Sequence, residues 1–154
     1  MELIYRRASL EDIALLTETR VTVLRAANRL SEDTDMEEVR VQSRRYYRKA
    51  LSDGSHTAWL VLDGERCVGT GGVSFFQIMP TYHNPSGTRA YIMNIYTDPA
   101  YRRRGIAYRV LDLLIQEARA RGVAAISLEA TDMGRPLYEK YGFVPMENEM
   151  ELPV

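Results

Sequence analysis

The stretch that most constrains this chain covers residues 91–114, where an apolar strand pattern leads directly into an amphipathic helix pattern. A basic turn, residues 102–107, joins the two, with Gly105 at the expected start of the helix. The first N–H groups of a helix have no acceptor within the helix and lie at the positive end of its dipole. Such a turn binds anions, phosphate above all, so we predict a phosphate site here.

The strand–helix–strand order around this turn predicts the fold class. Gly122 closes the helix, and a second apolar strand follows over residues 123–130. Two strands joined through a helix lie parallel, with a right-handed crossover. The fold class is therefore α/β with a parallel pair at its centre, and a ligand is expected beyond the carboxyl ends of these strands.

The remaining patterns complete a single mixed α/β domain over residues 1–154. Capping-box patterns at Ser9 and Thr34 predict two helices, the first reaching about Ala27 and the second ending at Ser52-Asp53-Gly54. Further elements are strands at 3–7, 57–62, 67–76 and 89–96, a helix at 134–141, and a closing hairpin at 143–144 and 150–152. The expected order is β-α-α-β-β-β-α-β-α-β-β. Glycines at 69, 71 and 72 indicate a close backbone approach or a bulge.

Composition excludes several classes of function. The net charge of −1, from 20 basic and 21 acidic side chains, argues against a nucleic-acid partner. No apolar run approaches the roughly 18–20 residues of a membrane span, and the N-terminus lacks a signal-peptide pattern. Cys67 is the only cysteine, which predicts a reducing, cytoplasmic location. His56 and His83 are isolated in the sequence, so no metal site is expected.

Two motifs resemble one family. The pattern Arg102-x-x-Gly105-x-Ala107 resembles the acyl-CoA signature of the GNAT superfamily of N-acetyltransferases. The run LYEKYGF, residues 137–143, resembles that family's C-terminal motif, and the interval of one helix and one strand is also similar. The resemblance covers essentially the full chain. It implies the acyl-CoA N-acyltransferase fold, with splayed central parallel strands, and acetyl-CoA (coenzyme A) as cofactor.

The resemblance also implies how the cofactor binds. The pantetheine arm would pair with the backbone of Ile95 and Thr97 as an added strand, and the pyrophosphate would lie on the N–H groups of residues 103–107. The expected cofactor-binding residues are Ile95, Tyr96, Thr97, Arg102, Arg103, Arg104, Gly105, Ile106, Ala107, Thr131, Gly134 and Tyr138. Thr131 stands where the family often has asparagine, which leaves its contact open. The alternative for the basic turn is a solvated helix cap.

Tyr138 is the expected catalytic acid, because a phenol with a pKa of about 10 can protonate the sulfur of the departing coenzyme A. A packing role is its alternative, and Tyr141 is expected to pack. The candidates for the general base are Glu129 and Asn94. Glu129 could equally be an ordinary surface carboxylate. Asn94 cannot be a base itself but could orient a water, beside Tyr91 on the same strand.

The acceptor is poorly specified. The resemblance assigns residues 20–47 and 80–88 to its site. Acidic residues near the second helix start could attract a cationic amine or merely favour the helix dipole, whereas Arg20, Arg25 and Arg29 could bind a carboxylate. The predicted function is transfer of an acetyl group to a primary amine, of a small molecule or peptide, by direct attack in a ternary complex. A non-catalytic acyl-CoA-binding domain is the alternative. Neither a P-loop nor a G-x-G-x-x-G pattern occurs, and dimers are common in similar proteins.

Overall fold

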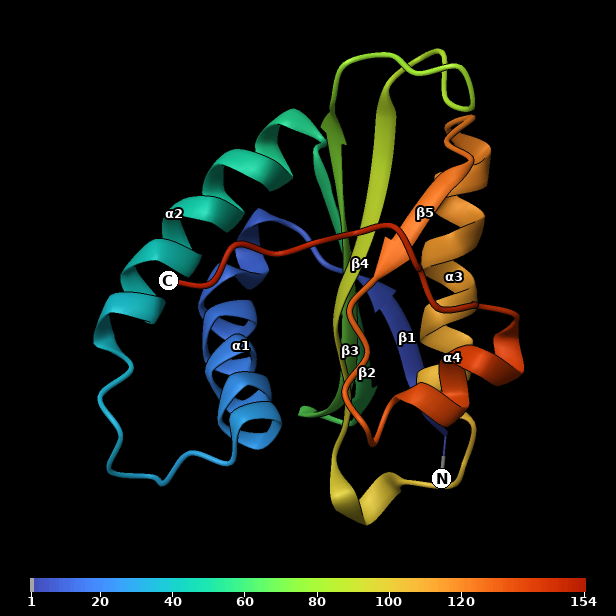
Figure 1. The fold of residues 1–154 in the computed structure, drawn as a ribbon. Helices are drawn as coiled ribbons and strands as arrows, with labels where there is room; N and C mark the ends of the chain where they lie inside the picture. Colours follow the sequence, from blue (N-terminus) through green and yellow to red (C-terminus); the bar gives the residue numbers. More distant parts are fainter. Residues whose placement is uncertain (1) are drawn as a thin grey trace.

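A five-stranded mixed sheet lies at the centre of the computed structural model, which describes residues 2–154 (Figure 1). The strands follow chain order across the sheet: β1 (Ile4–Arg7), β2 (His56–Asp63), β3 (Arg66–Gln77), β4 (Thr88–Thr97) and β5 (Ala125–Leu128). Neighbours are antiparallel from β1 to β4, and β4 pairs with β5 in parallel. The predicted mixed α/β class and its parallel pair are confirmed, but the pair lies at one edge of the sheet and not at its centre, because no strand follows β5 in the described chain.

Helices cover both faces of this sheet. Helices α1 (Ile13–Asn28) and α2 (Glu37–Asp53) lie on one face, and α3 (Ile106–Ala120) lies on the other, with α4 (Arg135–Tyr141) beside it (Figure 1). Two short 3-10 helices, Leu10–Asp12 and Pro99–Tyr101, precede α1 and α3. The larger core joins α3 to the inner strands, and a smaller core joins α1 and α2 to β2.

The two capping predictions had different outcomes. The backbone N–H of Ser9 donates to the Asp12 carboxylate at 2.8 Å, which confirms the first capping box. The second was wrong, because α2 begins at Glu37 with Met36 at its N-cap position. Met36 is buried, and Asp35 rather than Thr34 accepts the N–H of Glu37, at 2.9 Å. The helix therefore starts three residues after Thr34, with the Asp35 carboxylate accepting its first N–H.

The predicted closing hairpin was also wrong. No strand forms after α4 in the described chain, and Val144, Met150 and Leu152 are exposed. Pro145 has no backbone N–H to donate to a neighbouring strand. The alternating apolar residues after α4 also have no sheet face against which to pack. The tail instead runs back toward α2 (Figure 1).

Strand β4 extends beyond its parallel partner. Pairing runs from Arg89 opposite Ala125 to Ile92 opposite Leu128, whereas β4 continues to Thr97. The edge of residues 93–97 that faces β5 is therefore unpaired within the described chain, which confirms the predicted divergence of the central strands.

A bulge lies at the start of this unpaired edge. On the other side of β4, Tyr96 pairs with Thr70 and Met93 with Gly72, so β4 carries one extra residue. Asn94 adopts φ 64°, a left-handed conformation that asparagine tolerates better than most residues.

Glycines in β3 let α3 pack directly on the strand, as predicted. A Cβ on Gly71 would lie 2.5 Å from Val110 Cγ1, and one on Gly69 would lie 2.9 Å from Ile106 Cγ2. The close approach fixes the first turns of α3 against the sheet, next to the end of β4. Within residues 2–154, no helix combines the length and apolarity that crossing a membrane requires.

Candidate active site

A cavity of about 360 Å³ lies between the end of β4, the start of α3 and α4; we call it the β4–α3 cavity. It brings together eleven of the twelve predicted cofactor residues. These are Ile95, Tyr96, Thr97, Arg102, Arg103, Gly105, Ile106, Ala107, Thr131, Gly134 and Tyr138. The twelfth, Arg104, does not line it, and its guanidinium lies 5.2 Å from the centre of the Tyr101 ring.

The basic turn is held open by local contacts. Asp98 accepts the N–H of Ala100 at 2.9 Å, and Arg102 Nε donates to the carbonyl of Thr97 at 3.3 Å. Gly105 is the N-cap of α3 with φ 77°, and a Cβ there would meet nothing within 4 Å. Glycine is required here by its backbone conformation and leaves space above the first N–H groups of α3. The turn can therefore accept an anion against its backbone.

One polar atom of this cavity lacks a partner. Thr97 Oγ1 is buried and forms no hydrogen bond to any residue of the described chain. A buried hydroxyl without a partner costs free energy. The unpaired edge of β4 adds backbone donors and acceptors beside this hydroxyl.

Tyr138 lies half-buried in the β4–α3 cavity, with its ring edge-on to Phe143 at 6.2 Å between centroids. Burial raises the pKa of its phenol above the ordinary value of 10.0. The hydroxyl therefore carries its proton at neutral pH. Gly134 makes room for the ring, since a Cβ there would lie 2.9 Å from Tyr138 Cε2.

Tyr141 packs, as predicted. Its hydroxyl donates to Asp112 Oδ1 at 2.6 Å, and its ring lies 5.2 Å from that of Tyr108. Burial, together with the hydrogen bond to Asp112, raises its pKa to about 12.

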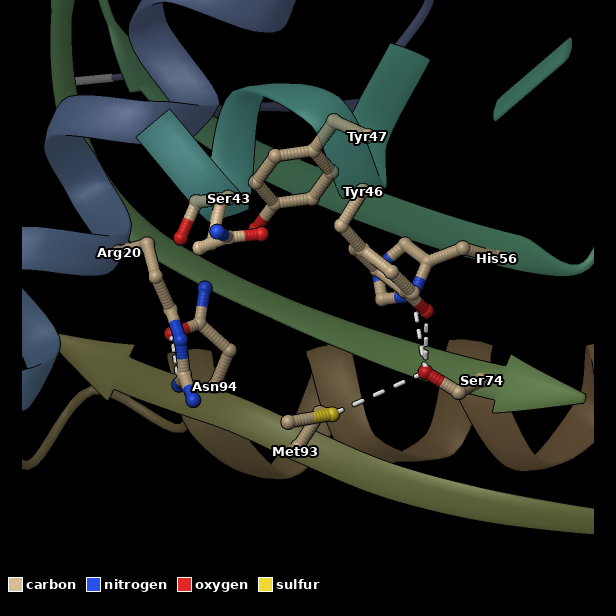
Figure 2. A pocket seen from close by; sticks show the side chains of 9 residues that line it. Arg20, Ser43, Tyr46, Tyr47, His56, Ser74, Met93 and Asn94 are labelled. Atoms are coloured by element: carbon tan, nitrogen blue, oxygen red, sulfur yellow. Dashed lines mark hydrogen bonds between the residues drawn. The ribbon is translucent and has the colours of Figure 1, made fainter. Parts of the chain in front are cut away.

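A second cavity, of about 290 Å³, lies on the opposite face of the sheet, beneath α1 and α2; we call it the α1–α2 cavity (Figure 2). It is lined by Arg20, Gln42, Ser43, Tyr46, Tyr47, His56, Ser74, Met93 and Asn94. Because of the bulge, two consecutive β4 residues, Met93 and Asn94, line this cavity, whereas Ile95 lines the other. The two cavities therefore border the β4 bulge from opposite faces of the sheet.

One end of the α1–α2 cavity is a neutral polar cluster (Figure 2). Tyr46 Oη lies 2.9 Å from His56 Nδ1 and 2.6 Å from Ser74 Oγ. Burial lowers the pKa of His56 to about 4, and the charge of Arg20 acts in the same direction. His56 is therefore uncharged at neutral pH. The sequence analysis did not predict this cluster, because His56 comes to lie opposite Ser74 only through a register shift in the β2–β3 hairpin, between Val61 and Leu62.

At the other end, Arg20 Nη1 donates to Asn94 Oδ1 at 3.0 Å (Figure 2). Asn94 thus lies in a cavity, as its predicted role requires, but Glu129 lines neither cavity. Glu129 is exposed just after β5, near Tyr91, whose pKa rises through burial and through this carboxylate. Arg25 does not line the cavity and instead holds the α1–α2 connection through the carbonyls of Glu32 and Thr34.

The other predicted acceptor elements stay outside. The loop at residues 80–88 lines neither cavity, and the same holds for the acidic residues Glu32, Asp33, Asp35, Glu37 and Glu38. No group of three or more potential metal ligands occurs among residues 2–154.

Two solved acetyltransferase structures resemble this chain over nearly its whole length. The crystal structure of a predicted acetyltransferase with acetyl-CoA from Clostridium acetobutylicum matches with a TM-score of 0.91 and 33% identity, over 99% of this chain and 96% of that one. A GCN5-related N-acetyltransferase from Ralstonia eutropha matches with a TM-score of 0.83 and 29% identity, over 99% of both chains.

Two curated relatives are also named N-acetyltransferases, and they match this chain over a shorter span. A glucosamine 6-phosphate N-acetyltransferase of Trypanosoma brucei brucei is 27% identical over 53% of this chain, and an uncharacterized N-acetyltransferase, YsnE, of Bacillus subtilis is 32% identical over 56%. The matched part spans about half the length of each of these relatives, 55% in both cases. The family model for the acetyltransferase (GNAT) family matches residues 23–143, and the chain belongs to that family.

Proposed function

We propose that this protein is an acetyl-CoA-dependent N-acetyltransferase that acts on a primary amine of a small molecule or peptide, by direct attack in a ternary complex. The observation that carries the proposal is that two cavities border the same β4 bulge, one with a basic turn at a helix start and the other with polar side chains. The match to a structure with acetyl-CoA supports the choice of cofactor. The single, unpaired cysteine supports a cytoplasmic location.

The residues of the β4–α3 cavity fit coenzyme A. The turn at 102–107 would hold the pyrophosphate, and the unpaired edge at 93–97 would pair with the pantetheine amides. Thr97 Oγ1 would gain the partner that it lacks. Bound acetyl-CoA would supply an acetyl thioester, whose carbonyl carbon accepts the amine and whose sulfur leaves.

Tyr138 would give its phenolic proton to that sulfur as negative charge develops there. Its raised pKa keeps the proton in place until then. On the amine side, Asn94 would orient the nucleophile or a water that carries its proton to solvent, because no Asp or Glu lines either cavity in the described chain.

The two tyrosines of α4 supply a matched test. Tyr138→Phe should lower kcat by about tenfold or more, with little change in affinity for acetyl-CoA or in unfolding free energy. Tyr141→Phe should leave kcat unchanged but lower the free energy of unfolding by about 1–2 kcal/mol, since it removes a hydrogen bond to a carboxylate. An unchanged kcat in Tyr138→Phe would remove this residue from the mechanism. Failure of acetyl-CoA and CoA to bind saturably in calorimetry would refute the whole proposal.

The missing carboxylate favours one alternative, a non-catalytic acyl-CoA-binding domain of the same fold. Such a domain would bind the cofactor in calorimetry yet transfer no acetyl group in a mass-spectrometric screen of amines. Transfer to any amine, at a rate above that in buffer and sensitive to Tyr138→Phe, excludes it.

A further inference from the structure

The α1–α2 cavity carries one positive charge and no negative one. Arg20 is its only ionised side chain, because burial holds His56 neutral and raises the pKa values of Tyr46 and Tyr47. Its other polar residues are amides and hydroxyls. A cationic acceptor such as a polyamine would be repelled here, whereas an oxyanion would be attracted.

Arg20 itself lacks a carboxylate partner. It is half-buried, and among residues 2–154 it forms no salt bridge. Its described hydrogen bond, to Asn94, uses one of the five N–H donors of a guanidinium. Withdrawing a charge from water without an opposite charge costs free energy, and the remaining donors suit a forked contact with a carboxylate. An anion that enters this cavity would therefore find the unused donors of Arg20.

The position of Arg20 restricts how far this anion lies from the reacting amine. Arg20 contacts Asn94, and the next residue, Ile95, already lines the β4–α3 cavity. An amine that reaches the β4 bulge from the α1–α2 cavity therefore lies within a few bonds of a group bound by Arg20. In an α-amino acid the amino nitrogen and the carboxylate are separated by a single carbon, which fits this requirement.

The end of the cavity opposite Arg20 indicates what the rest of the ligand is like. Tyr46, His56 and Ser74 offer neutral donors and acceptors across the cavity from Arg20 (Figure 2). Met93 lies between the two ends. A volume of about 290 Å³ is at the small end of ligand pockets, which suits a molecule of amino-acid size.

We propose that the α1–α2 cavity binds a free amino acid with a polar side chain as the acetyl acceptor. Arg20 pairs with its carboxylate, Asn94 lies beside its amino group, and Tyr46, His56 and Ser74 contact the side chain. The assignment deepens the proposed function and rests on it, because it treats this cavity as the acceptor side.

The test compares sets of acceptors that differ in one group. L-Serine, L-threonine, L-glutamine and L-histidine are assayed as acceptors by thiol release from acetyl-CoA. Each is compared with its carboxamide and with its decarboxylated amine. Putrescine and 2-aminoethyl phosphate are assayed separately as two further acceptors. For at least one set, we expect kcat/KM for the carboxylate to exceed that for the carboxamide by about ten- to a hundredfold. Arg20→Gln should abolish this preference, and Arg20→Lys should retain part of it. Arg44→Gln, which removes an exposed charge from α2, should retain all of it. Thermal unfolding of each variant checks that it is folded.

A binding measurement separates the two proposals. The same amino acids are titrated calorimetrically into protein saturated with CoA, and we expect Arg20→Gln, but not Arg44→Gln, to weaken binding by about tenfold or more. Arg20-dependent binding without acetyl transfer would refute the enzymatic function and leave the amino-acid site standing. Transfer that favours carboxamides, putrescine or 2-aminoethyl phosphate, or a carboxylate preference that survives in Arg20→Gln, would overturn the amino-acid site. Neither binding nor transfer would refute both.

Discussion

The packing of α3 on β3 predicts that a single methyl group at Gly71 destabilises the fold. A Cβ there would lie 2.5 Å from Val110 Cγ1, 2.7 Å from Ile95 Cδ1 and 3.2 Å from Leu114 Cδ1. Ile95 Cδ1 is the end of a flexible side chain and can rotate away. Val110 cannot, because it is fully buried on a helix. We expect Gly71→Ala to lower the free energy of unfolding by about 1–3 kcal/mol, the usual cost of overpacking.

A double-mutant cycle identifies the contact responsible. Val110→Ala alone should cost about 2 kcal/mol through lost burial and a cavity. In the double variant the new methyl fills part of that cavity, so the two costs should fall short of additive by about 1–2 kcal/mol. Urea unfolding followed by circular dichroism measures all four proteins, with unchanged m-values as the check on two-state behaviour. Additivity within about 0.5 kcal/mol, or a Gly71→Ala variant as stable as the parent, would refute the close-approach reasoning.

Three further predictions concern the two cavities and the turn at the start of α3. Thr97→Val replaces an unpartnered buried hydroxyl with a methyl, so the unfolding free energy should stay equal or rise by about 1 kcal/mol while calorimetric affinity for CoA falls. His56, with a folded pKa of about 4 against an ordinary 6.5, is protonated first in the unfolded chain. Its contribution to stability is therefore complete above pH 6.5 and is lost as the pH falls toward 4, by about 3 kcal/mol in total. Chemical denaturation should show that the free energy of unfolding falls less between pH 6.5 and 5 in His56→Gln than in the parent protein. Asp98→Ala removes the acceptor for Ala100 N–H and the ion pair with Arg66. Thermal unfolding should therefore report a free energy of unfolding lower by about 1 kcal/mol, and calorimetry a weaker affinity for CoA. An unchanged affinity would mean that the turn keeps its shape without this cap.

Local patterns in the sequence sufficed for most of the sheet and for the β4–α3 cavity. The strand, the basic turn and the helix of residues 91–114 are contiguous, so their geometry follows from helix-start and strand physics alone. Gly105 was expected only to let backbone approach a phosphate, and its positive φ could not be predicted, because the residue before a helix ordinarily adopts an extended conformation.

The features that escaped prediction depend on contacts between distant segments. The cluster of Tyr46, His56 and Ser74 joins α2, β2 and β3, and no spacing along the chain reveals it. The position of Glu129 outside both cavities follows from where β5 ends, at Leu128, one residue earlier. The closing hairpin failed because alternation predicts a strand only where a partner edge and a buried face exist.

The pairing around the bulge also predicts what a deletion would do. Without Asn94, Ile95 would stand opposite Gly71, and Met93 and Ile95 would still point to opposite faces of the sheet. Ile95 would stay in the core around α3, whereas the α1–α2 cavity would lose the side chain that contacts Arg20. The extra residue therefore adds a polar side chain to that cavity without changing the register of the strand on either side of it.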